Sequence, residues 1–502
     1  MKKIVTCWVL CLQFFLLNAQ KVIYSEPDRD DTRQTDFDII GKVGGNILIY
    51  KTLRSNYTMS VYDMNLKEKD KVKLDFLPER IINADFLAYP DFCYMFYQYQ
   101  KKNILYAMAA KIDGNGKLIG KEMLMDTTVI GFLASNKIYS VVNSDNKEYI
   151  DLLKINSKDE ERFLVTTMLF TKELAQKEKT RLTINMPDRH DFLTGFMVDN
   201  DGDFAFLRAV QDGEHDKLQH LFLHTKMPGA TNTEVYAIDL KKTWLEDVRL
   251  KSDNYNRHYI ISSFYSNTKR GNVDGMYTCV WDKATTTTSS VVSVVFSEQL
   301  RNEARGDNGT KTAFNDYFIR NIIVRKDGGF ILAAESFFSS SRGGTNRYDY
   351  MYGSPFLQPA DFYSFGTLGL GYPWYRYNNL GQNIRYNAQN ITVFSFDSSG
   401  KINWTNVITK NQYDDETDAY IGYSLLNTGD QLHFLFNQLE RRLQLLSAQS
   451  ISPEGKVTRN PTLKNLDKGY DFMAHYGKQI GQRQIIFPCM YRNYLCFAKL
   501  DF

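Results

Sequence analysis

The sequence has no marked excess of charge of either sign. Its 61 lysines and arginines nearly balance 58 aspartates and glutamates, which leaves a net charge of +3. Nucleic-acid-binding proteins usually carry a dense basic stripe, so this balance argues against a nucleic-acid partner. Beyond the first residues, no apolar run is long enough to cross a bilayer as a helix. We therefore expect no nucleic-acid partner and no transmembrane helix.

The sequence also lacks the short motifs by which many enzymes are recognised. It contains no HExxH, no GxSxG, no Walker loop, and no GxGxxG between a strand and a helix. His215, His220 and His224 have a spacing that suggests metal ligation. On a strand, however, positions 220 and 224 lie about 13 Å apart, so we interpret these histidines as structural. We expect no metal and no cofactor, and the sequence names no catalytic residue.

Cysteine is scarce once the first residues are set aside. Four remain, at Cys93, Cys279, Cys489 and Cys496. If Arg492-Asn493 form a two-residue turn, Cys489 and Cys496 lie directly opposite each other on neighbouring strands. They could then form a disulfide in an oxidising compartment, but two buried thiols are the favoured interpretation.

The first nineteen residues, MKKIVTCWVLCLQFFLLNA, are typical of a secretory signal peptide. Two lysines precede an apolar run from Ile4 to Leu17, and cleavage is expected after Ala19. At about 14 residues, the apolar run is shorter than the ~20 that a membrane-spanning helix needs. We expect residues 1–19 to be removed and the protein to be periplasmic, outer-membrane-associated or extracellular.

What the sequence does contain is a repeated pattern of short strands. Residues 314–336, FNDYFIRNIIVRKDGGFILAAES, read as a strand, an Asp-Gly-Gly turn and a second strand. Residues 390–410, NITVFSFDSSGKINWTNVITK, add a strand, a Ser-Ser-Gly turn and another strand. Together they give four antiparallel strands, which is one blade of a β-propeller. Weaker copies recur, so the sequence predicts an all-β propeller with eight blades, or with seven as the alternative.

The two ends of the chain are expected to close the ring. The last unit supplies only three strands, while residues 21–26, KVIYSE, form a strand without a neighbour in the sequence. Pairing these segments would remove exposed sheet edges and make residues 20–502 one domain. Strands such as NILIY and FILAA are apolar on both faces, which is typical of sheets packed between other sheets. An outer-membrane β-barrel, whose strands alternate between lipid and lumen, is the less favoured alternative.

Four local patterns are interpreted as structural. Residues 199–203, DNDGD, resemble the start of a calcium loop, but Phe204 replaces the EF-hand glycine, so a hairpin turn is predicted. Residues 395–404, SFDSSGKINW, resemble the sialidase Asp-box and the tryptophan-docking repeat of quinoprotein propellers. Their spacing departs from both, and we expect only a tight turn and an aromatic residue, Trp404, between blades. Short helices are predicted over Lys172–Lys179, capped by Thr171, and after Ser297, ending near Gly306.

A tyrosine-rich insert at residues 346–386 is the most distinctive segment. It separates the second and third strands of one blade and is therefore expected to be a loop. Aromatic rings with polar tips suit stacking on sugars or packing against another protein. The alternative is a low-complexity loop that folds back over the propeller. The candidate ligand-binding residues are Tyr348, Tyr350, Tyr352, Trp374, Tyr375 and Tyr377.

Over its whole length the sequence resembles secreted, β-propeller-like proteins of Bacteroidetes that have no established activity. The resemblance lies in the segments LLNAQ, FNDYFIRNIIVRKDGGFILAAES with the insert after it, HFLFNQ, NPTLKNLDKGYDF and IIFPCMYRNYLCFAKLDF. It implies export from a Gram-negative cell. It implies no activity and no functional residues.

The sequence favours a non-catalytic, monomeric module of the cell envelope that binds a protein or a glycan, or acts as a scaffold. Its loop-bearing face and the tyrosine-rich insert would form the binding surface. The alternative is a glycan hydrolase or lyase that uses two carboxylates of the central channel, about 5–10 Å apart.

Overall fold

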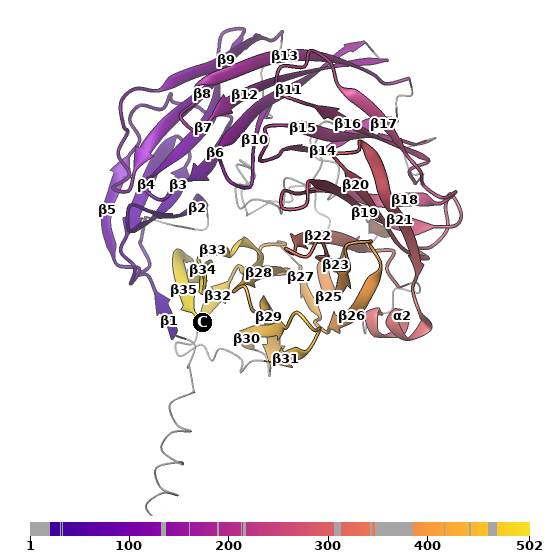
Figure 1. Cartoon of the computed structure of the whole chain (residues 1–502). Coiled ribbons are helices and arrows are strands. Elements are labelled where there is room, and N and C mark those ends of the chain that lie inside the picture. The colour runs from indigo at the N-terminus through magenta and orange to yellow at the C-terminus, as the bar shows by residue number, and fades with distance from the viewer. Residues whose placement is uncertain are drawn as a thin grey trace, which may run out of the picture.

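The computed structural model describes the chain from Lys21 to Phe502, except for residues 31, 33, 132–136, 160, 188–189, 212, 214–216, 306–312, 342–343, 347–384, 416, 441–442 and 460–468. Its strands form eight separate antiparallel sheets arranged around a central axis (Figure 1). The chain is therefore an eight-bladed β-propeller, as the sequence predicts. The alternatives of seven blades and of a single closed sheet are wrong.

Blades 1 to 4 follow one another along the chain, and the first strand of each lies nearest the axis (Figure 1). Blade 1 consists of β2 (Asp36–Val43), β3 (Asn46–Leu53), β4 (Asn56–Tyr62) and β5 (Glu68–Lys73). Blade 2 consists of β6 (Asn83–Ala88), β7 (Phe92–Lys101), β8 (Ile104–Asp113) and β9 (Met123–Val129). Blade 3 consists of β10 (Tyr139–Asn143), β11 (Tyr149–Asp159), β12 (Arg162–Thr171) and β13 (Gln176–Asn185). Blade 4 consists of β14 (Phe192–Val198), β15 (Phe204–Val210), β16 (His220–Lys226) and β17 (Glu234–Ile238).

Blades 5 to 7 continue this order. Blade 5 consists of β18 (Trp244–Asp253), β19 (His258–Ser266), β20 (Gly275–Asp282) and β21 (Thr287–Val295). Blade 6 consists of β22 (Tyr317–Val324), β23 (Phe330–Ser341), β25 (Arg385–Phe396) and β26 (Ile402–Ile408), with β24 (Gly344–Asn346) beside β23 and β27 (Gln412–Asp414) beside β25. Blade 7 consists of β28 (Tyr423–Asn427), β29 (Leu432–Glu440), β30 (Leu443–Ile451) and β31 (Val457–Arg459).

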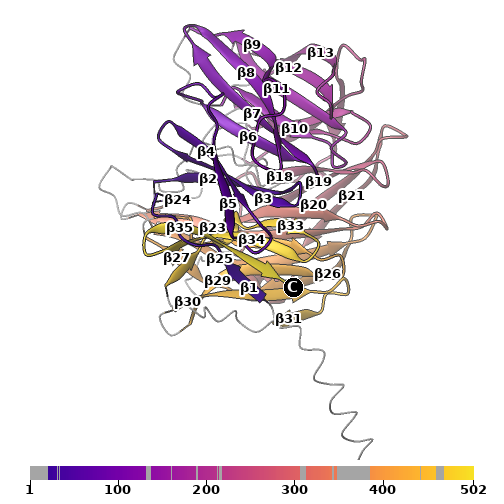
Figure 2. The ribbon, with the colours of Figure 1, turned by 90° about the vertical axis from the view of Figure 1, so that its left-hand side faces the viewer.

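Blade 8 is built from both ends of the chain. Its inner edge is divided into β32 (Tyr470–Phe472) and β33 (Lys478–Gly481) by the short helix η2 (Ala474–Tyr476), and both pair with β34 (Gln484–Tyr491). The strand β35 (Tyr494–Asp501) follows, and β1 (Lys21–Tyr24) completes the sheet, as Figure 2 shows. Val22 lies opposite Leu500, so the predicted closure of the ring is confirmed.

The sheets are apolar on both faces because each packs between two others. In β3, Ile47 and Ile49 pack toward blade 8, while Leu48 and Tyr50 pack toward blade 2. All four are 6% exposed or less. Full burial of such a side chain stabilises the fold by about 1.5–3 kcal/mol relative to exposure. The strand NILIY therefore has the two-sided burial that its sequence predicts.

A five-residue turn recurs between the third and fourth strands of the blades. In Asp63–Lys67, Asp113–Lys117 and Asp397–Lys401, the first carboxylate accepts the N–H groups of the third and fifth residues. The fourth residue has a positive φ, which is +78° at Gly400 and strains a side chain there. The spacing of two residues between Asp397 and Gly400, which matches neither known repeat, is thus regular in this chain.

Trp404 joins blades 6 and 7 through such a turn. Its Nε1 donates to the carbonyl of Pro453 at 3.0 Å, and Asn406 Nδ2 donates to the carbonyl of Gly455 at 2.8 Å. Gly455 lies directly under the indole, since a Cβ there would be 2.7 Å from Trp404 Cδ2. The prediction that Trp404 lies between adjacent blades is confirmed.

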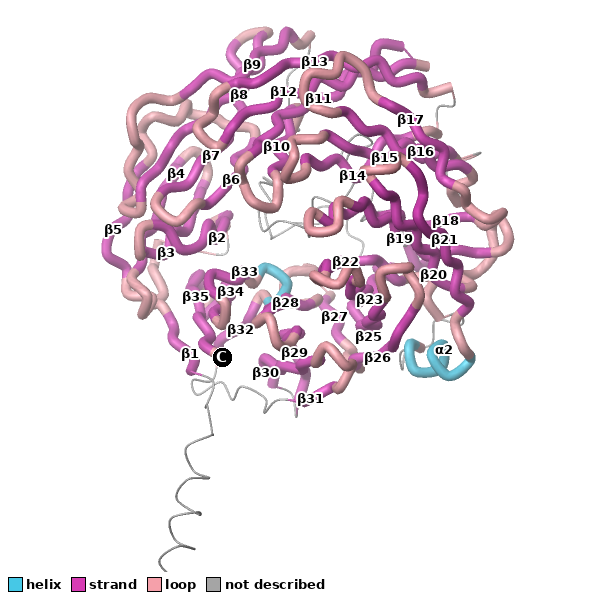
Figure 3. Tube along the Cα trace, in the orientation of Figure 1, coloured by secondary structure: helices cyan, strands magenta, loops and turns pink. Residues whose placement is uncertain are grey.

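One of the two predicted helices exists. Ser297 caps α2 (Glu298–Ala304) by accepting the N–H of Leu300, as predicted (Figure 3). The helix expected over Lys172–Lys179 is wrong. Thr171 begins a turn, and β13 starts at Gln176 and pairs along β12. Pairing with β12 outweighs the local helix propensity of a lysine- and glutamate-rich segment.

The hairpin β34–β35 brings two cysteines together. Arg492 and Asn493 have φ values of +48° and +72°, as a two-residue turn requires, and Cys489 lies opposite Cys496. Both are buried free thiols whose sulfur atoms are 3.0 Å apart. A disulfide between them stays the less favoured alternative to two buried thiols. Among the described residues, no helix has the length and apolar character needed to span a bilayer.

Candidate functional site

Two adjoining pockets lie where the inner strands meet around the axis. The smaller, about 220 Å³, is lined by residues of blades 2 to 6. The larger, about 490 Å³, is lined by residues of blades 1, 2, 3 and 8. Asn143 at the end of β10 lines both pockets. Both lie toward the end of the channel where first strands turn into second strands, since Asp145 and Lys147 of the β10–β11 turn contribute to them. We call this end the channel mouth.

Bulges in the inner strands direct polar side chains at the smaller pocket. The pairing register shifts in β14 near Gly195, in β18 near Asp247 and in β22 near Arg320, and such bulges re-aim side chains. Asp247 has a φ of +54°. Its carboxylate accepts the N–H of Ile319 on the next inner strand and lies 3.0 Å from Arg249 Nη2. The bulge therefore ties two inner strands together and fixes Arg249 at the pocket wall.

Arg320 lines the same pocket and is held from behind. Its Nε lies 3.2 Å from Glu335 Oε2, and Lys410 Nζ lies 2.8 Å from Glu335 Oε1. All three side chains are buried. Separating a buried ion group leaves an uncompensated charge, so its three members stay together and the pocket wall at Arg320 is rigid. Two cations and one carboxylate give this wall a net positive charge.

The rim of the channel mouth is a chain of hydrogen-bonded turns. The N–H of Asn146 in blade 3 donates to Asn200 Oδ1 in blade 4, at 3.0 Å. The N–H of Asn200 donates in turn to Asn254 Oδ1 in blade 5, at 2.9 Å. Asn254 Nδ2 donates to Asp145 Oδ2, back in blade 3, at 2.6 Å. The three asparagines are 54 residues apart, so the sequence does contain a regular repeat at this rim.

Positive side chains outnumber carboxylates in the walls of the two pockets. The only two described carboxylates that line them are Asp85, which lies 3.0 Å from Lys137, and Asp145, which lies 2.9 Å from Lys251. The cations that line them are Lys42, Lys137, Lys147, Arg249, Lys251, Arg320 and Lys478. The channel mouth is thus electropositive although the whole chain is nearly neutral.

Besides Asp85, whose pKa burial raises, two carboxyl groups near the axis have raised pKa values. Asp36 and Asp38 lie two residues apart on β2, so they share one side of the strand at about 7 Å. Burial raises the pKa of each to about 6, and for Asp38 the nearby Lys478 opposes that rise. Neither residue is among those that line the two pockets. A buried acid of raised pKa suits proton transfer, but these two carboxyls do not line either pocket.

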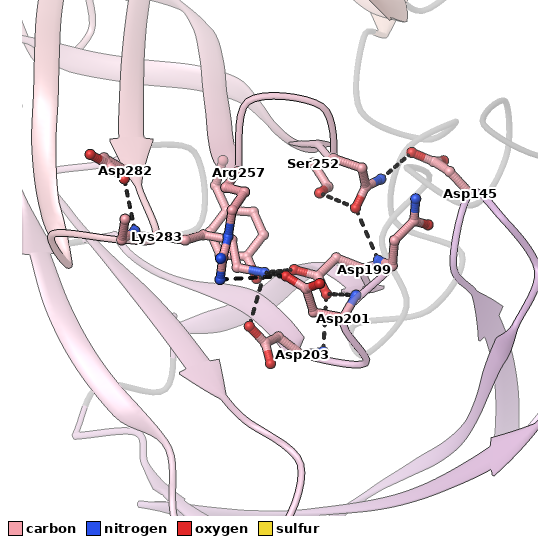
Figure 4. A network of polar contacts seen from close by, with 12 residues as sticks. Asp145, Asp199, Asp201, Asp203, Ser252, Arg257, Asp282 and Lys283 are labelled. Carbon is pink, nitrogen blue, oxygen red and sulfur yellow. Dashed lines mark hydrogen bonds and ion pairs between the residues drawn. The ribbon is translucent and has the colours of Figure 1, made fainter.

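The aspartate-rich segment at residues 199–203 is a turn, as predicted (Figure 4). Asp199, Asp201 and Asp203 bring their carboxylates within 4.8 Å of one another. Lys283 of blade 5 fills this space, lying 3.0 Å from Asp201 and 2.9 Å from Asp203 and bonding to Asp199 as well. Burial would lower the pKa of Lys283, but the three carboxylates outweigh it and raise that pKa. The ammonium group therefore stands where a cation would bind, and it joins blades 4 and 5.

The predicted structural role of His224 is confirmed. His224 is 4% exposed and stacks on Phe206 at 4.7 Å between ring centroids. Burial, helped by the charge of Arg208, lowers its pKa to about 4, so the imidazole is neutral. His220 is exposed, and His215 lies outside the described residues.

The tyrosine-rich insert carries all six predicted ligand-binding residues. Tyr348, Tyr350, Tyr352, Trp374, Tyr375 and Tyr377 lie outside the described residues, so their role stays a prediction. The boundary at 386 is too late, because β25 begins at Arg385 and Tyr386 is a buried strand residue beside Phe337. Arg385 pairs with Asp415 at 2.6 Å and lies over the ring of Tyr413. Extended ends of β23 and β25, flanked by β24 and β27, therefore frame the insert.

The sequence interpretation missed the lysines and arginines of the channel mouth. Lys147 lies in an ordinary turn between β10 and β11, and Lys478 lies in a broken inner strand, so neither belongs to a motif. Only the radial arrangement of distant blades brings them to one pocket. The repeat of asparagine at positions 146, 200 and 254 is the one signal in the sequence that could have identified this rim.

No protein-family model matches the chain, and no curated protein matches it either. A mutant of Synechocystis apocarotenoid oxygenase is similar in structure, with 10% identity, a TM-score of 0.36, and coverage of 75% of this chain and 74% of that chain. A prolyl endopeptidase is similar with 11% identity, a TM-score of 0.35, and coverage of 85% of this chain and 56% of that chain. These likenesses are too distant to carry an argument about activity, and the fold rests on the sheets themselves.

Proposed function

We propose that the protein is an exported, non-catalytic binding module of the cell envelope that holds a protein or glycan ligand at its channel mouth. The observation that carries this proposal is the pair of adjoining pockets that share Asn143 and have walls rich in positive charge. Ligand pockets typically measure about 300–1,000 Å³ and combine apolar walls with a few placed polar groups. The hydrogen-bonded rim and the ion-paired walls mean that this site is formed before a ligand arrives, which favours binding.

Filling the shared part of the two pockets tests the proposal. Asn143→Trp places a large side chain at their junction, so an immobilised variant should lose the partner that wild-type protein captures from an envelope extract. Asn65→Trp is the matched control, because Asn65 is exposed in the β4–β5 turn, away from the channel. Both variants are compared with wild type by thermal unfolding. Equal capture by wild type, Asn143→Trp and Asn65→Trp would show that the channel mouth is not the binding site.

Export is supported by the leader-like residues 1–19. Cleavage after Ala19 would leave Gln20 as the new amino terminus, directly before β1. The closing strand would then become the start of the exported chain. N-terminal sequencing of protein recovered from periplasmic or extracellular fractions tests this, and recovery with Met1 at the terminus in the cytoplasm would contradict it.

A glycan hydrolase or lyase is the second candidate, favoured by the raised pKa values of Asp36 and Asp38. A general acid needs such a pKa near neutrality. Against this role, both carboxyls lie outside the pocket linings, and Asp85 and Asp145 inside them are each paired with a lysine. Release of sugars from an oligosaccharide panel, lost in Asp38→Asn, would establish the catalytic alternative.

A further inference from the structure

The larger pocket collects lysines from three blades that are distant in the sequence. Lys42 comes from β2 of blade 1, Lys147 from the β10–β11 turn of blade 3, and Lys478 from β33 of blade 8. None of the described residues that line this pocket is acidic. Three positive charges therefore face one partly enclosed space of about 490 Å³.

Lys147 is held at the wall of this pocket, near enough to Lys478 for the charge of Lys478 to act on it. Lys147 Nζ donates to the carbonyl of Ala88 at 2.7 Å, which fixes its ammonium group at the pocket wall. An ammonium has three N–H donors, so further donors are available to a ligand. Burial lowers the pKa of both lysines, and the charge of Lys478 lowers the pKa of Lys147 further, while Asp38 opposes the fall in the pKa of Lys478. A negative group between them would relieve both the repulsion and the loss of solvent.

The adjoining pocket supplies apolar walls to the same site. Among the residues that line it are Val142, Leu250 and Ile322, and Ile40 and Ile480 line the larger pocket. Sugar hydroxyls placed against these aliphatic side chains would lose hydrogen bonds to water without replacement, which costs free energy. A peptide can instead place a carboxylate beside an aliphatic side chain, so the wall chemistry favours an acidic peptide over a glycan.

We infer that the channel mouth binds an acidic peptide segment of a partner protein, with a carboxylate between Lys147 and Lys478 and an apolar side chain in the adjoining pocket. The inference rests on the proposed binding role and specifies the class of ligand. It also explains why the positive charges gather in the channel of a chain whose overall charge is close to zero.

Selection from an unbiased library of short displayed peptides tests the inference while the partner itself is unidentified. Wild-type protein is the target, and the double variant Lys147→Met/Lys478→Met is used to remove peptides that bind elsewhere. The selected sequences should be rich in Asp and Glu flanked by aliphatic residues. A fluorescent version of a selected peptide should bind the double variant about tenfold or more weakly than wild type, and more weakly in high salt.

The matched control is Lys117→Met/Lys456→Met, which removes two exposed lysines from turns at the same end of the propeller. This variant should bind the peptide as wild type does and keep the wild-type melting temperature. Lys147→Met/Lys478→Met removes the charge of Lys478 near Asp38, so it should melt at a lower temperature but still in one cooperative transition. A peptide with glutamine in place of glutamate should not bind. Selection of peptides without acidic residues, no enrichment at all, or lysine-dependent binding of oligogalacturonate in place of peptides would overturn the inference. In each of these cases Asn143→Trp could still lose capture of the envelope partner. The proposal of a binding site at the channel mouth would then hold although the inference of an acidic peptide had failed.

Discussion

At the scale of single residues, this propeller uses several polar side chains to join neighbouring blades. Lys283 forms ion pairs with three aspartates of the preceding blade, and Asp247 ties one inner strand to the next. Trp404 covers a glycine in the following blade. Each contact is made across a seam between sheets, where backbone hydrogen bonds are few, such as those between Leu218 and Leu245. Substitution of one of these residues should therefore weaken the contact between two blades and lower the stability of the whole propeller, even where the residue has few neighbours within its own blade.

Gly455→Ala should destabilise the protein through the seam between blades 6 and 7. The new Cβ would lie 2.7 Å from the Trp404 indole, at a φ of +86°. Gly229→Ala is the matched control, because Gly229 has a φ of +84° and nothing within 4 Å of the added carbon. Urea unfolding should show that Gly455→Ala lowers the free energy of unfolding by about 2 kcal/mol more than Gly229→Ala. Equal losses would show that the indole does not need this close approach.

Asp36→Asn should stabilise the protein near neutral pH but not in acid. Burial raises the pKa of Asp36 to about 6 in the folded state, while an unfolded aspartate titrates near about 4. The folded state therefore binds the proton of Asp36 more tightly than the unfolded state does. The contribution of Asp36 to stability thus falls as pH rises from about 4 to about 6 and is level above that. Asparagine removes the buried charge, so the variant should gain about 1–2 kcal/mol at neutral pH and nothing at about pH 4.

Chemical denaturation of wild type and Asp36→Asn at a series of pH values measures this difference. Asp75→Asn serves as the control, since the Asp75 side chain is 73% exposed and its substitution should give a difference independent of pH. A gain from Asp36→Asn that is the same in acid and at neutral pH would mean that the buried charge is not its cause.

At the scale of elements, the recurring five-residue turn and the closing strand account for most of the regularity. The turn requires only one side-chain acceptor and one residue that tolerates positive φ, so it survives large changes in sequence. The closing strand has the opposite character, because β1 has no partner until the whole chain has been made. Its pairing with β35 covers a sheet edge that would otherwise be exposed.

Removal of residues 20–26 should open the ring. The variant loses the pairing of β1 with β35 and the stacking of Tyr24 on Tyr470, whose ring centroids are 4.3 Å apart. We expect the free energy of unfolding to fall by about 3 kcal/mol or more, and the exposed edge of β35 to promote self-association. Thermal unfolding and size-exclusion chromatography measure the two effects. A truncated chain that stays monomeric with the wild-type melting temperature would show that closure by β1 is dispensable.

At the scale of the whole molecule, the two ends of the channel differ. The pockets lie where first strands turn into second strands, whereas β23 ends and β25 begins at the other end, with β24 at the edge of the molecule in Figure 2. The tyrosine-rich insert is therefore attached away from the channel mouth. Two binding surfaces on one propeller could then act independently.

Replacement of residues 347–384 by a short Gly-Ser linker should separate these surfaces. We expect the free energy of unfolding to change by no more than about 0.5 kcal/mol, because both flanking strands keep their pairing. Peptide binding at the channel mouth should be unchanged, while capture of any partner that depends on the insert should be lost. A clear drop in melting temperature would instead support the alternative that the insert folds back over the propeller.

The sequence by itself determined the propeller fold, the closure of the ring and the role of Trp404, and it favoured eight blades over seven. These features depend on local alternation, turn residues and two-sided apolar strands, all of which are set by residues close together in the chain. The helix over Lys172–Lys179 failed because pairing with β12 is not visible in a local window. Only the tertiary structure decided where the charges meet, because Lys42, Lys147 and Lys478 come from three blades and share a pocket only once the ring closes.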